Sequence, residues 1–478
     1  MAFSNPIPSP VSSNIYINGL LWGKHWNDPA NGTRLSVYIA GQQGNETFDF
    51  GGTPVTANTV SQEIIAFQNA MQLIENVCNI DFIATSSQTD ADLILGAVNN
   101  IDAEGGLGTS VPPGEDTGPI TSQQGSVIIN FDSYFSTDYS SLQPGGYDFT
   151  TFIHELGHAT GLKHPHDSGG GPRPNFPGVT SAFDDYGDFN LNQGVFTMMS
   201  YNDGWRTAPT GPLDPFSTPS YGYEGTPMAF DIAALQFLYG ANTSFHSGND
   251  LYTLSAINAP GTFYSCIWDV GGIDTIQNTT ASNSIMDLRA ATLQHAAGGG
   301  GFISFVNGIN GGFSIANGVT IENATGGTAI DSITGNGAAN ILSGNAGNDR
   351  ISGLGGADKI NGGSGADILA GGGGADDFVY TAITDSANSQ FDTVNDFVHS
   401  LDDIDVAAID ANGSAAGNAA FTFRGKSAFT GAGAEIRYFK NTTQNFTNIQ
   451  IDIDGNKAAD MTIRLTGTID LSVEDFIL

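Results

Sequence analysis

Two patterns of hydrophobic residues divide the chain, and the change from one to the other falls near residue 241. In the first part, apolar side chains recur every three to four positions after Thr59, at Ile64, Phe67, Met71 and Ile74. This spacing predicts an amphipathic helix, and the separation of Thr59 and Gln62 is that of a capping box, so we expect the helix to begin there. In the second part, helical spacing disappears, and short apolar pulses alternate with Gly, Asn, Asp and Thr.

The first part also shows the pattern of a mixed α and β unit. Apolar runs over residues 91–98 and 125–131 predict buried strands. Further helices are predicted over 147–160 and 227–239. Residues 1–14 are rich in Pro, Ser and Asn, and they predict an extended arm.

A nine-residue repeat covers residues 326–379. Its frames begin at Gly326, Gly335, Gly344, Gly353, Gly362 and Gly371. Its sixth position holds Asp331, Asn340, Asp349, Asp358, Asp367 and Asp376, and its eighth position is always apolar. This register matches the GGxGxDxUx nonapeptide of calcium-binding parallel β-rolls, in which glycines turn carbonyls inward and each last triplet forms a short strand. A flexible Gly-rich linker is the alternative, but it would show the composition without the register.

Composition favours cation binding and excludes other classes of protein. The chain has 14 Lys and Arg against 49 Asp and Glu, and its net charge of −35 would repel nucleic acid. Of the acidic residues 39 are Asp, whose short side chain suits tight oxygen cages around Ca²⁺. No apolar run is long enough for a membrane span, so we expect no membrane insertion. The first residues lack the features of a secretory signal peptide, so export would need another signal.

The most specific motif in the chain is a histidine cluster. It reads His154-Glu155-Leu156-Gly157-His158-Ala159-Thr160-Gly161-Leu162-Lys163-His164. On a helix, His154 and His158 project from one face toward one ion, with Glu155 beside them as a general base. Gly161 would end the helix and let His164 complete a three-nitrogen zinc site. Three protein ligands leave room for water and substrate, which is typical of catalytic rather than structural zinc.

The motif and its surroundings resemble the serralysins, which are secreted bacterial zinc endopeptidases of the metzincin group. Pro165 follows the motif directly, and Met199-Ser200-Tyr201 follows later. The strings at 231–236, 238–240, 268–274 and 318–324 are similar to the family as well, and they occur in its order between about residue 55 and 478. The C-terminal Asp475-Phe476-Ile477-Leu478 is similar to the acidic-then-hydrophobic tail read by type I secretion machinery.

The resemblance implies roles for residues around the histidines. It implies one catalytic zinc, held by His154, His158, His164 and Tyr201. Glu155 would be the general base, and Tyr201 would leave the zinc during turnover to stabilise the oxyanion. Met199 would be the Met-turn residue, a hydrophobic floor beneath the zinc.

The resemblance also implies several structural calcium ions. Outside the repeats their ligands would be Gly248, Asp250, Asp269, Gly271, Gly272, Asp274, Thr320 and Glu322. Within the repeats they would be Gly327, Asp331, Asn345, Gly347, Asp349, Gly356, Asp358, Gly363, Gly365, Asp367, Gly372, Gly374 and Asp376. A final pair would be Asp396 and Asp402.

Several of these residues have an ordinary alternative. Met199 could be a core methionine and Tyr201 a packed aromatic, while Asp396 and Asp402 could belong to a solvated acidic face. His166 lies next to the motif but outside its pattern, and we expect it to be a solvated loop residue.

These observations combine into one interpretation of the chain. The expected fold is an α+β metzincin-type catalytic domain followed by an all-β parallel β-roll or β-sandwich domain. The expected boundaries are 1–14 for an arm or short propeptide, 15–240 for the protease and 241–478 for the roll with its C-terminal secretion signal. The expected function is a secreted zinc endopeptidase stabilised by calcium. We expect the strand at 125–131 to border the cleft and to pair with an extended peptide.

The expected partners follow from that function. They are protein and peptide substrates and the type I secretion apparatus, with a proteinaceous inhibitor as a further candidate, and we expect a monomer. The alternatives are a non-catalytic calcium-dependent binding or adhesin protein on a degenerate protease fold, and a different roll-bearing enzyme such as one that modifies polysaccharides. The histidine motif argues against both alternatives.

Overall fold

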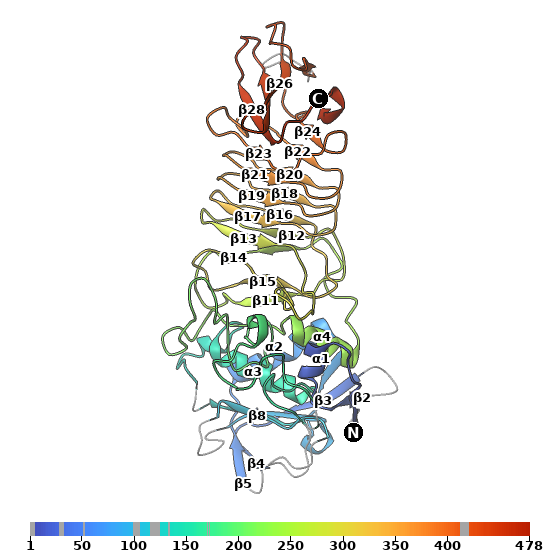
Figure 1. Cartoon of the computed structure of the whole chain (residues 1–478). Coiled ribbons are helices and arrows are strands. Elements are labelled where there is room, and N and C mark those ends of the chain that lie inside the picture. Colours follow the sequence, from blue (N-terminus) through green and yellow to red (C-terminus); the bar gives the residue numbers. More distant parts are fainter. Residues whose placement is uncertain are drawn as a thin grey trace.

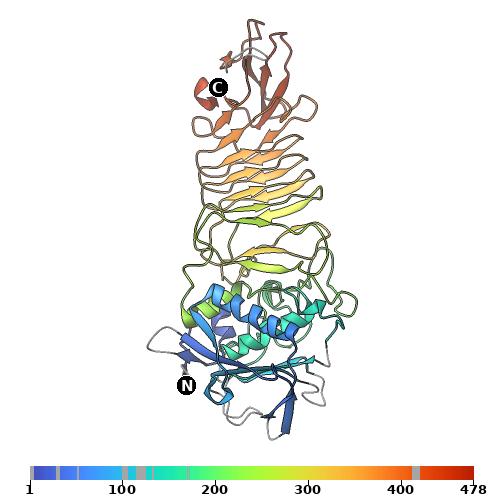
Figure 2. The same cartoon turned by 180° about the vertical axis from the view of Figure 1, so that it is seen from behind.

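The structure is a computed structural model that describes residues 5–27, 33–50, 53–98, 106–114, 125–131, 134–169, 171, 173–411 and 420–478. The side chains of residues 48–50 and 53–55 are outside the description. In both views a body of helices and one sheet lies at the N-terminal end, and a stack of short strands leads from it to the C-terminus (Figures 1 and 2). No helix in the described ranges is long and apolar enough to cross a membrane.

The N-terminal sheet has the order β4-β5-β7-β3-β6, and β9 pairs with both β7 and β8. Its strands are β3 (Thr33–Ile39), β4 (Glu46–Phe50), β5 (Thr53–Ala57), β6 (Ile80–Ala84), β7 (Leu93–Val98), β8 (Gly108–Ser110) and β9 (Val127–Asn130). Strands β3, β6, β7 and β9 run parallel, whereas β8 is antiparallel to β9. Every residue of β7 and β9 is buried, which confirms the two predicted strands.

Helices cover this sheet and carry the histidine motif. They are α1 (Ile15–Leu20), α2 (Ser61–Val77), α3 (Tyr147–Ala159) and α4 (Ala229–Tyr239), with short 3₁₀ turns at Gln88–Asp90, Ser140–Leu142, Asp188–Asn190 and Val473–Asp475. Phe67 of α2 meets Phe152 of α3 edge-on, with ring centroids 4.7 Å apart. The predicted helices are confirmed, and almost the whole of α3 is buried.

The predicted cap of α2 is wrong. The helix begins at Ser61, and the N–H of Val60 donates to the carboxylate of Glu63 at 2.8 Å. Thr59 instead bridges two strands, since its hydroxyl donates to the carbonyl of Ala40 and accepts the N–H of Ala97. The hydroxyl of Thr59 therefore makes hydrogen bonds to distant segments of the chain and does not cap the helix, as its spacing from Gln62 had predicted.

The N-terminal arm is partly a strand. Residues Asn5–Pro8 form β1, which pairs antiparallel with β2 (Lys24–Asn27). Arg173, in the loop that follows the motif, donates to the carbonyl of Ser9 at 3.0 Å and to the side chain of Asn18 at 2.6 Å. The arm is thereby attached to the loop beside the histidines, while residues 1–4 of the predicted arm lie outside the described residues.

From residue 251 the chain winds through two sheets, an eight-stranded parallel sheet and a twelve-stranded sheet in which β14, β26 and β27 pair antiparallel with their neighbours within β13–β15 and β26–β28. One sheet has, in order, β10 (Leu251–Thr253), β12 (Thr275–Gln277), β16 (Asn323–Thr325), β18 (Ile341–Ser343), β20 (Lys359–Asn361), β22 (Asp377–Val379), β24 (Asp403–Asp405) and β29 (Phe476–Ile477). The other has β11 (Tyr264–Ile267), β15 (Gly312–Ile315), β14 (Ser304–Val306), β13 (Ser284–Asp287), β17 (Asp331–Thr334), β19 (Arg350–Ser352), β21 (Ile368–Ala370), β23 (Thr393–Val394), β28 (Met461–Thr466), β27 (Phe446–Asp452), β26 (Glu435–Asn441) and β25 (Thr422–Phe423).

The repeat register explains this winding. Successive repeats place their last triplet alternately in the two sheets, so that strands two repeats apart are neighbours in one sheet and pair parallel, as Ile333 does with Ile351. The eighth-position side chains form the core between the sheets, and each is at most 1 % exposed: Ile333, Leu342, Ile351, Ile360, Leu369 and Phe378. The predicted all-β roll over the repeats is confirmed, whereas the boundaries at residues 14 and 240 stay predictions.

Candidate metal centre and active site

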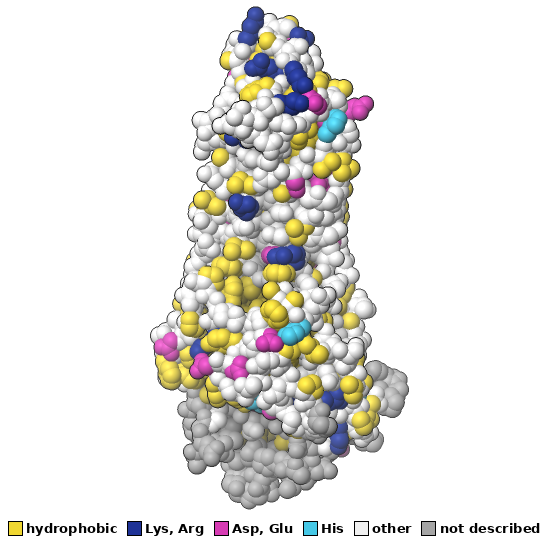
Figure 3. All heavy atoms as spheres, viewed as in Figure 1, with side chains coloured by type: hydrophobic (Ala, Val, Ile, Leu, Met, Phe, Trp, Pro, Cys, Tyr) yellow, Lys and Arg dark blue, Asp and Glu magenta, His cyan; other side chains and the backbone are white. Residues whose placement is uncertain are grey.

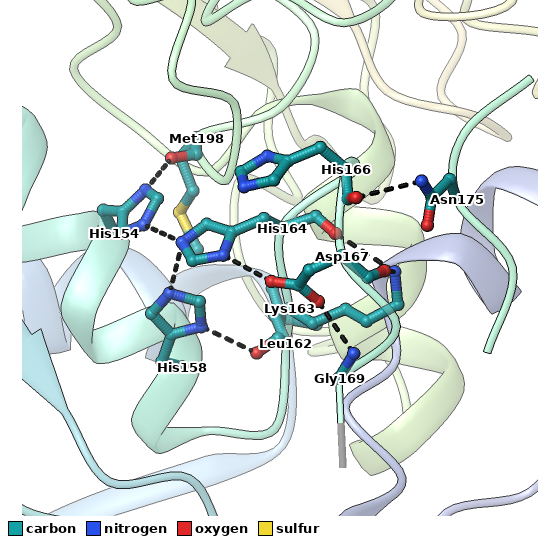
Figure 4. A network of polar contacts seen from close by, with 10 residues as sticks. All are labelled: His154, His158, Leu162, Lys163, His164, His166, Asp167, Gly169, Asn175 and Met198. Carbon is teal, nitrogen blue, oxygen red and sulfur yellow. Dashed lines mark hydrogen bonds and ion pairs between the residues drawn. The ribbon is translucent and has the colours of Figure 1, made fainter. Parts of the chain in front are cut away.

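Three histidines converge at the C-terminal end of α3. His154 and His158 lie on one face of the helix, and Gly161 ends it with a φ of +102°, a conformation that side chains rarely adopt. The chain then returns, so that the Nε2 atom of His164 lies 3.0 Å from that of His154 and 2.9 Å from that of His158 (Figure 4). The sequence-predicted triad is therefore brought together.

The outer nitrogens of the three rings show which atoms carry protons. The Nδ1 atoms of His154 and His158 face the carbonyls of Met198 (2.8 Å) and Leu162 (2.9 Å), which only accept hydrogen bonds. The Nδ1 of His164 faces the carboxylate of Asp167 at 2.6 Å. Each neutral ring is thus protonated at Nδ1, and three Nε2 lone pairs meet at one point. Such a donor set fits Zn²⁺, which binds imidazole nitrogen at about 2.0–2.1 Å.

Burial favours neutral rings in this cluster. Burial and the neighbouring histidines hold the pKa of His154 well below its usual value and lower that of His158 to about 3. A neutral imidazole is the form that binds a metal ion. His154 and His158 are therefore in the metal-binding form near neutral pH.

The loop after the motif supplies a residue that the sequence analysis missed. Asp167 accepts from His164 and from the N–H of Gly169 at 2.8 Å. Burial alone would raise its pKa, but the hydrogen bonds from His164 and Gly169 lower it to about 2. Lys163 is fully buried, and its Nζ donates to the carbonyls of His164 and Asp167 at 3.0 and 2.6 Å (Figure 4). Loop geometry of this kind leaves no periodic signal in a sequence.

The prediction for His166 is wrong. Its ring is half-buried and stacks on His164, with centroids 4.8 Å and planes 15° apart. Asn175 donates to its carbonyl at 2.9 Å, and the N–H of Phe176 donates to that of Pro165. These bonds fold the loop back onto the triad, so His166 is held against the site instead of extending into solvent.

Glu155 and Tyr201 border the triad. Glu155 is only 8 % exposed, and burial raises its pKa to about 8 when no metal ion is bound. The ring of Tyr201 lies 4.6 Å from that of His164 and 5.6 Å from that of His154. Burial and the charge of Glu155 raise the pKa of Tyr201 to about 12, so its hydroxyl stays protonated as a donor.

Met199 is fully buried beneath α3, where its sulfur lies against the backbone of Gly157. The turn that carries it is fixed by Asp231 of α4. This carboxylate accepts the hydroxyl of Thr197 at 2.6 Å and the N–H groups of Met198 and Met228 at 2.7 and 2.9 Å. Because Met198 in turn accepts from His154, α4 positions the first histidine.

Two cavities flank the triad, and Gly108, Glu155 and Tyr201 lie between them. The first, the Tyr147 cavity, has a volume of about 310 Å³ and is lined by Gly106, Leu107, Gly108, Tyr147, Thr150, Thr151, His154, Glu155, Phe183, Tyr201 and Asp203. The second, the Trp22 cavity, has about 250 Å³ and is lined by Trp22, Gly108, Thr109, Ser110, Val111, Pro112, Glu155, His158, His164, Asp167 and Tyr201. Together they form a cleft along β8.

The strand predicted to border the cleft is the wrong one. Strand β9, at 127–130, is enclosed, because it pairs with β7 on one side and β8 on the other. Among the described residues, β8 pairs only with β9 and lines both cavities. A side chain at Gly108 would collide with Thr151 and Glu155, so only glycine lets β8 lie this close to α3. The Gly-rich run that contains β8 has no alternating pattern, which is why it was missed.

The predicted calcium ligands before the repeats lie together. The N–H of Asp250 donates to Asp274 at 2.8 Å, that of Gly271 to Asp269 at 3.0 Å, and that of Asp274 to Glu322 at 2.8 Å. The backbone of Gly272 packs against the carbonyl of Gly248. Thr320 is exposed in the segment that leads to Glu322. Asp274 is fully buried, and its Oδ2 has no hydrogen-bond partner in the structure.

The sixth-position residues of the repeats form two files: the first contains Asp331, Asp349 and Asp367, and the second contains Asn340, Asp358 and Asp376. In each file the Oδ1 atom accepts the backbone N–H of the aspartate or asparagine 18 residues earlier, as Asp367 does from Asp349 at 2.7 Å. The Oδ2 atoms are buried without a partner at Asp349, Asp358, Asp367 and Asp376. These oxygens lie next to the first glycines of their repeats, Gly344, Gly353, Gly362 and Gly371. The glycine and asparagine ligands expected within the repeats stay predictions: Gly327, Asn345, Gly347, Gly356, Gly363, Gly365, Gly372 and Gly374. Buried carboxylate oxygens without a hydrogen-bond donor are suitable ligands for Ca²⁺.

The ends of the files differ from their middle. Asp331 accepts from Ser284 and Gly327, so both of its oxygens are bonded. Asp396 accepts from Gly371 and Gly372, and Asp402 accepts from Asp376 and Val398. These residues therefore differ from the middle aspartates in having protein donors at both oxygens.

Asp392 continues the first file after Asp367, and the sequence analysis did not identify it. Its Oδ1 accepts the N–H of Asp367 at 2.9 Å, and its Oδ2 is buried without a partner. An insertion after the last repeat breaks the nine-residue register before Asp392, so the repeat could not reveal it. Figure 3 shows few acidic side chains on the displayed face of the roll, in line with the inward position of these carboxylates.

Comparison with known proteins gives consistent matches. The family model of the serralysin C-terminal region of M10 peptidases matches residues 230–478. Serralysin from Proteus mirabilis is 36 % identical over 365 residues, which cover 73 % of this chain and 67 % of that protein. Serralysin C from Dickeya chrysanthemi is 38 % identical over 343 residues, 70 % and 63 % of the two chains. Metalloprotease AprA from Pseudomonas entomophila is 34 % identical over 410 residues, 83 % and 76 % of the two chains.

Proposed function

Because this chain belongs to the serralysin family of M10 peptidases, we propose that it is a secreted zinc endopeptidase that hydrolyses extended protein substrates. The observation that carries the proposal is the convergence of three Nε2 atoms whose rings each hold their proton on Nδ1. His154, His158 and His164 would hold the zinc, with Tyr201 as a further ligand at rest. The protease fold of residues 15–240 would be of the metzincin type.

The catalytic step rests on two side chains beside the triad. When bound, zinc supplies a Lewis acid that polarises the scissile carbonyl and makes water more acidic. Glu155 takes a proton from the attacking water and returns it to the leaving amine. The hydroxyl of Tyr201, protonated over the working pH range, donates to the developing oxyanion.

Substrate recognition would use the edge of β8. An extended peptide adds a strand there, and backbone hydrogen bonds hold it across both cavities without demanding a particular sequence. Antiparallel addition is favoured, because antiparallel pairs are slightly more stable per residue. The carbonyl to be cleaved then lies above Glu155, which lines both cavities.

Calcium would stabilise the second half of the chain. The buried, unpartnered oxygens of the repeat aspartates support several Ca²⁺ ions along the roll. Because metal binding supplies folding free energy, the roll would be loose where free calcium is scarce and would fold after export. We propose that the C-terminal residues 475–478 direct export through a type I apparatus, that protein substrates are met outside the cell, and that an inhibitor protein is a further partner.

Hydrolysis of internally quenched peptides tests the proposal. The full-length protein, loaded with zinc and calcium, should cleave internal bonds, and a zinc chelator should abolish cleavage until zinc is restored. The histidine variant His164→Ala, compared with the exposed His295→Ala, should lose the activity while the control keeps it. A protein that binds calcium but cleaves no peptide or casein would instead support the calcium-dependent binding alternative.

A further inference from the structure

The last antiparallel strands of the chain have one buried face and one outward face. Strands β26, β27 and β28 pair so that Arg437 lies opposite Gln450, and Asn448 lies opposite Arg464. On the inner face, apolar side chains such as Ile463 are fully buried. Side chains alternate along a strand, so the outward face carries the other set of positions. Its central residues, which we call the arginine face, are Arg437, Phe439, Phe446, Asn448, Gln450, Thr462 and Arg464.

Aromatic rings hold the two guanidinium groups of the arginine face. The Cζ atom of Arg464 lies 4.4 Å from the ring centre of Phe391 and 4.2 Å from that of Phe446. The Cζ atom of Arg437 lies 4.8 Å from the ring centre of Phe429. Stacking of this kind covers the flat surfaces of a guanidinium but uses none of its N–H groups. The edges of both groups therefore stay open to hydrogen-bond acceptors.

Neighbouring amides orient the same two groups. The Nε and Nη2 atoms of Arg437 donate to Oε1 of Gln450 at 3.1 and 2.6 Å. The Nε atom of Arg464 donates to Oδ1 of Asn448 at 3.2 Å. A guanidinium has five N–H groups, so each keeps several that no described residue accepts. Because rings and amides already fix these side chains, they lose little entropy when they bind an anion.

Neither guanidinium of the arginine face has a carboxylate partner in the part of the chain that the structure describes. Other basic residues of this region do have one, since Arg424 pairs with Glu435 at 3.4 Å and Lys426 pairs with Asp470 at 2.5 Å. The chain has 49 acidic residues against 14 Lys and Arg, so carboxylates are in excess. Two fixed arginines that pair with none of them indicate a place for an anion from outside the chain.

Basic residues are concentrated at this end of the molecule. Six of the 14 Lys and Arg lie between residues 424 and 464, and Figure 3 shows such side chains gathered at the end that carries β26–β28. On the same strands Glu435 and Asp452 are at most 3 % exposed, and nearby donors satisfy their carboxylates. Further acidic residues follow in the loop 453–460, which bounds the basic area on that side. Charge complementarity therefore favours an anionic ligand here.

The spacing on this face favours a ligand with more than one anionic group. Both guanidinium groups bond to side chains of β27, and these side chains, Asn448 and Gln450, are two residues apart. Two residues span about 7 Å along a strand. Two anionic groups of one polymer can therefore each meet a guanidinium.

The remaining side chains of the arginine face suit a sugar. The amides of Asn448 and Gln450 and the hydroxyl of Thr462 offer hydrogen-bonding groups for sugar hydroxyls. Phe439 is 39 % exposed and meets Phe446 edge-on, with ring centroids 6.4 Å apart. An open ring of this kind can pack against the apolar C–H face of a sugar ring. The face thus combines charged, polar and aromatic contacts on one open sheet.

We propose that the arginine face binds an acidic polysaccharide, whose carboxylates pair with Arg437 and Arg464 while its hydroxyls meet the amides between them. Nucleic acid is a poorer fit, because the net charge of −35 repels its closely spaced phosphates. An anionic membrane is also a poorer fit, because it attracts clusters of basic residues and not two guanidiniums fixed between rings. The face lies at the far end of the roll from the histidine triad (Figure 1), so this binding leaves the cleft open.

Affinity gel electrophoresis of the calcium-loaded full-length protein tests the proposal. The gels contain hyaluronan, xanthan or carboxymethyl cellulose, and the matched neutral gels contain carboxyl-reduced hyaluronan or hydroxyethyl cellulose. We expect at least one acidic polymer to retard the protein and neither neutral polymer to do so. The retardation should weaken as sodium chloride is raised, because salt screens the ion pairs.

Single variants assign the binding to its residues. Arg437→Gln and Arg464→Gln should each raise the Kd for the polymer about 10- to 100-fold. The corresponding lysine variants keep the charge but lose the planar fork, so they should retain part of the affinity, and they replace a glutamine variant that does not fold. Arg350→Gln is the matched control, because it removes the same charge from exposed β19 of the same sheet, outside the arginine face. Calcium-dependent circular dichroism checks the fold of each variant.

Three results would overturn the proposal. The first is the absence of retardation by all of the acidic polysaccharides. The second is an equal loss of affinity in Arg350→Gln and in the two arginine-face variants, which would show an effect of net charge alone. The third is binding of single-stranded DNA or of phosphatidylglycerol vesicles that is as tight as that of the polysaccharide. Peptide hydrolysis is measured separately, so failure here leaves the proposed endopeptidase function standing.

Discussion

The Nδ1 atom of His164 and the carboxylate of Asp167 lie 2.6 Å apart, which joins the third histidine to the loop that follows the motif. The carboxylate fixes the tautomer of the ring and makes its Nε2 a stronger ligand. Lys163 and Gly169 hold the same loop, so the geometry of the third ligand depends on residues outside the motif.

Removal of this carboxylate should weaken zinc binding. We expect Asp167→Ala to raise the zinc dissociation constant about 10- to 100-fold, as measured by competition with a chromogenic chelator. Asp188→Ala is the matched control, because Asp188 makes a similar 2.8 Å contact with His295 on the surface. Equal zinc affinity in the two variants would show that Asp167 does not support the site.

Replacement of Glu155 should separate binding from catalysis. Glu155→Gln keeps the shape of the buried side chain but cannot accept the proton of water, so we expect hydrolysis to fall about 10²- to 10⁴-fold or further. Zinc content and melting temperature should stay close to those of the parent protein. Turnover at the parental rate by a zinc-loaded variant would refute the role of Glu155 as general base.

Neighbouring aspartates in one repeat allow a direct test of calcium binding. Asp376 is 1 % exposed with an unpartnered oxygen, whereas Asp377 pairs with Lys359 at 2.9 Å on the surface. We expect Asp376→Asn to raise the calcium concentration needed to fold the roll about tenfold, because a charged ligand is lost. Asp377→Asn should leave it nearly unchanged. Circular dichroism during a calcium titration measures both, and a larger effect of Asp377→Asn would contradict the assignment.

Without calcium, the roll should become less stable as pH rises. Burial raises the pKa of Asp349 to about 7 and those of Asp358 and Asp367 to about 6. In the unfolded chain an aspartate titrates near pH 3.9. Between about pH 4 and 7 the folded state therefore binds more protons than the unfolded state, and the free energy of unfolding falls as pH rises.

The measurement is thermal unfolding of the calcium-free protein at pH 5 and pH 7.5. We expect the melting temperature of the roll to be about 5 °C or more higher at pH 5. With saturating calcium the difference should shrink or reverse, because calcium binds the ionised carboxylates. A calcium-free roll that is more stable at pH 7.5 would show that these aspartates are not buried as described.

The parts predicted from sequence were those with strong local repetition. The motif from His154 to His164 has fixed helical spacing and one obligatory glycine, so its convergence could be predicted. The nine-residue register likewise identified the buried side chains of the roll. In both cases the local structure is determined by residues that are close together in the sequence.

The parts not predicted depend on contacts between distant segments. Thr59 bonds to two strands instead of capping α2, and β8 lies in a short Gly-rich run without alternation. Asp167 and His166 reach the site because their loop folds back. Asp392 follows an insertion that breaks the register, so its place in the first file appears only in three dimensions.

The central claim is tested most directly by elemental analysis of the purified protein alongside casein hydrolysis before and after zinc removal. We expect about one zinc per chain and several calcium ions, with hydrolysis that stops when zinc is removed and returns when it is added back. Calcium without zinc, and no hydrolysis even after zinc is supplied, would contradict the claim and leave a calcium-stabilised roll attached to an inactive protease fold.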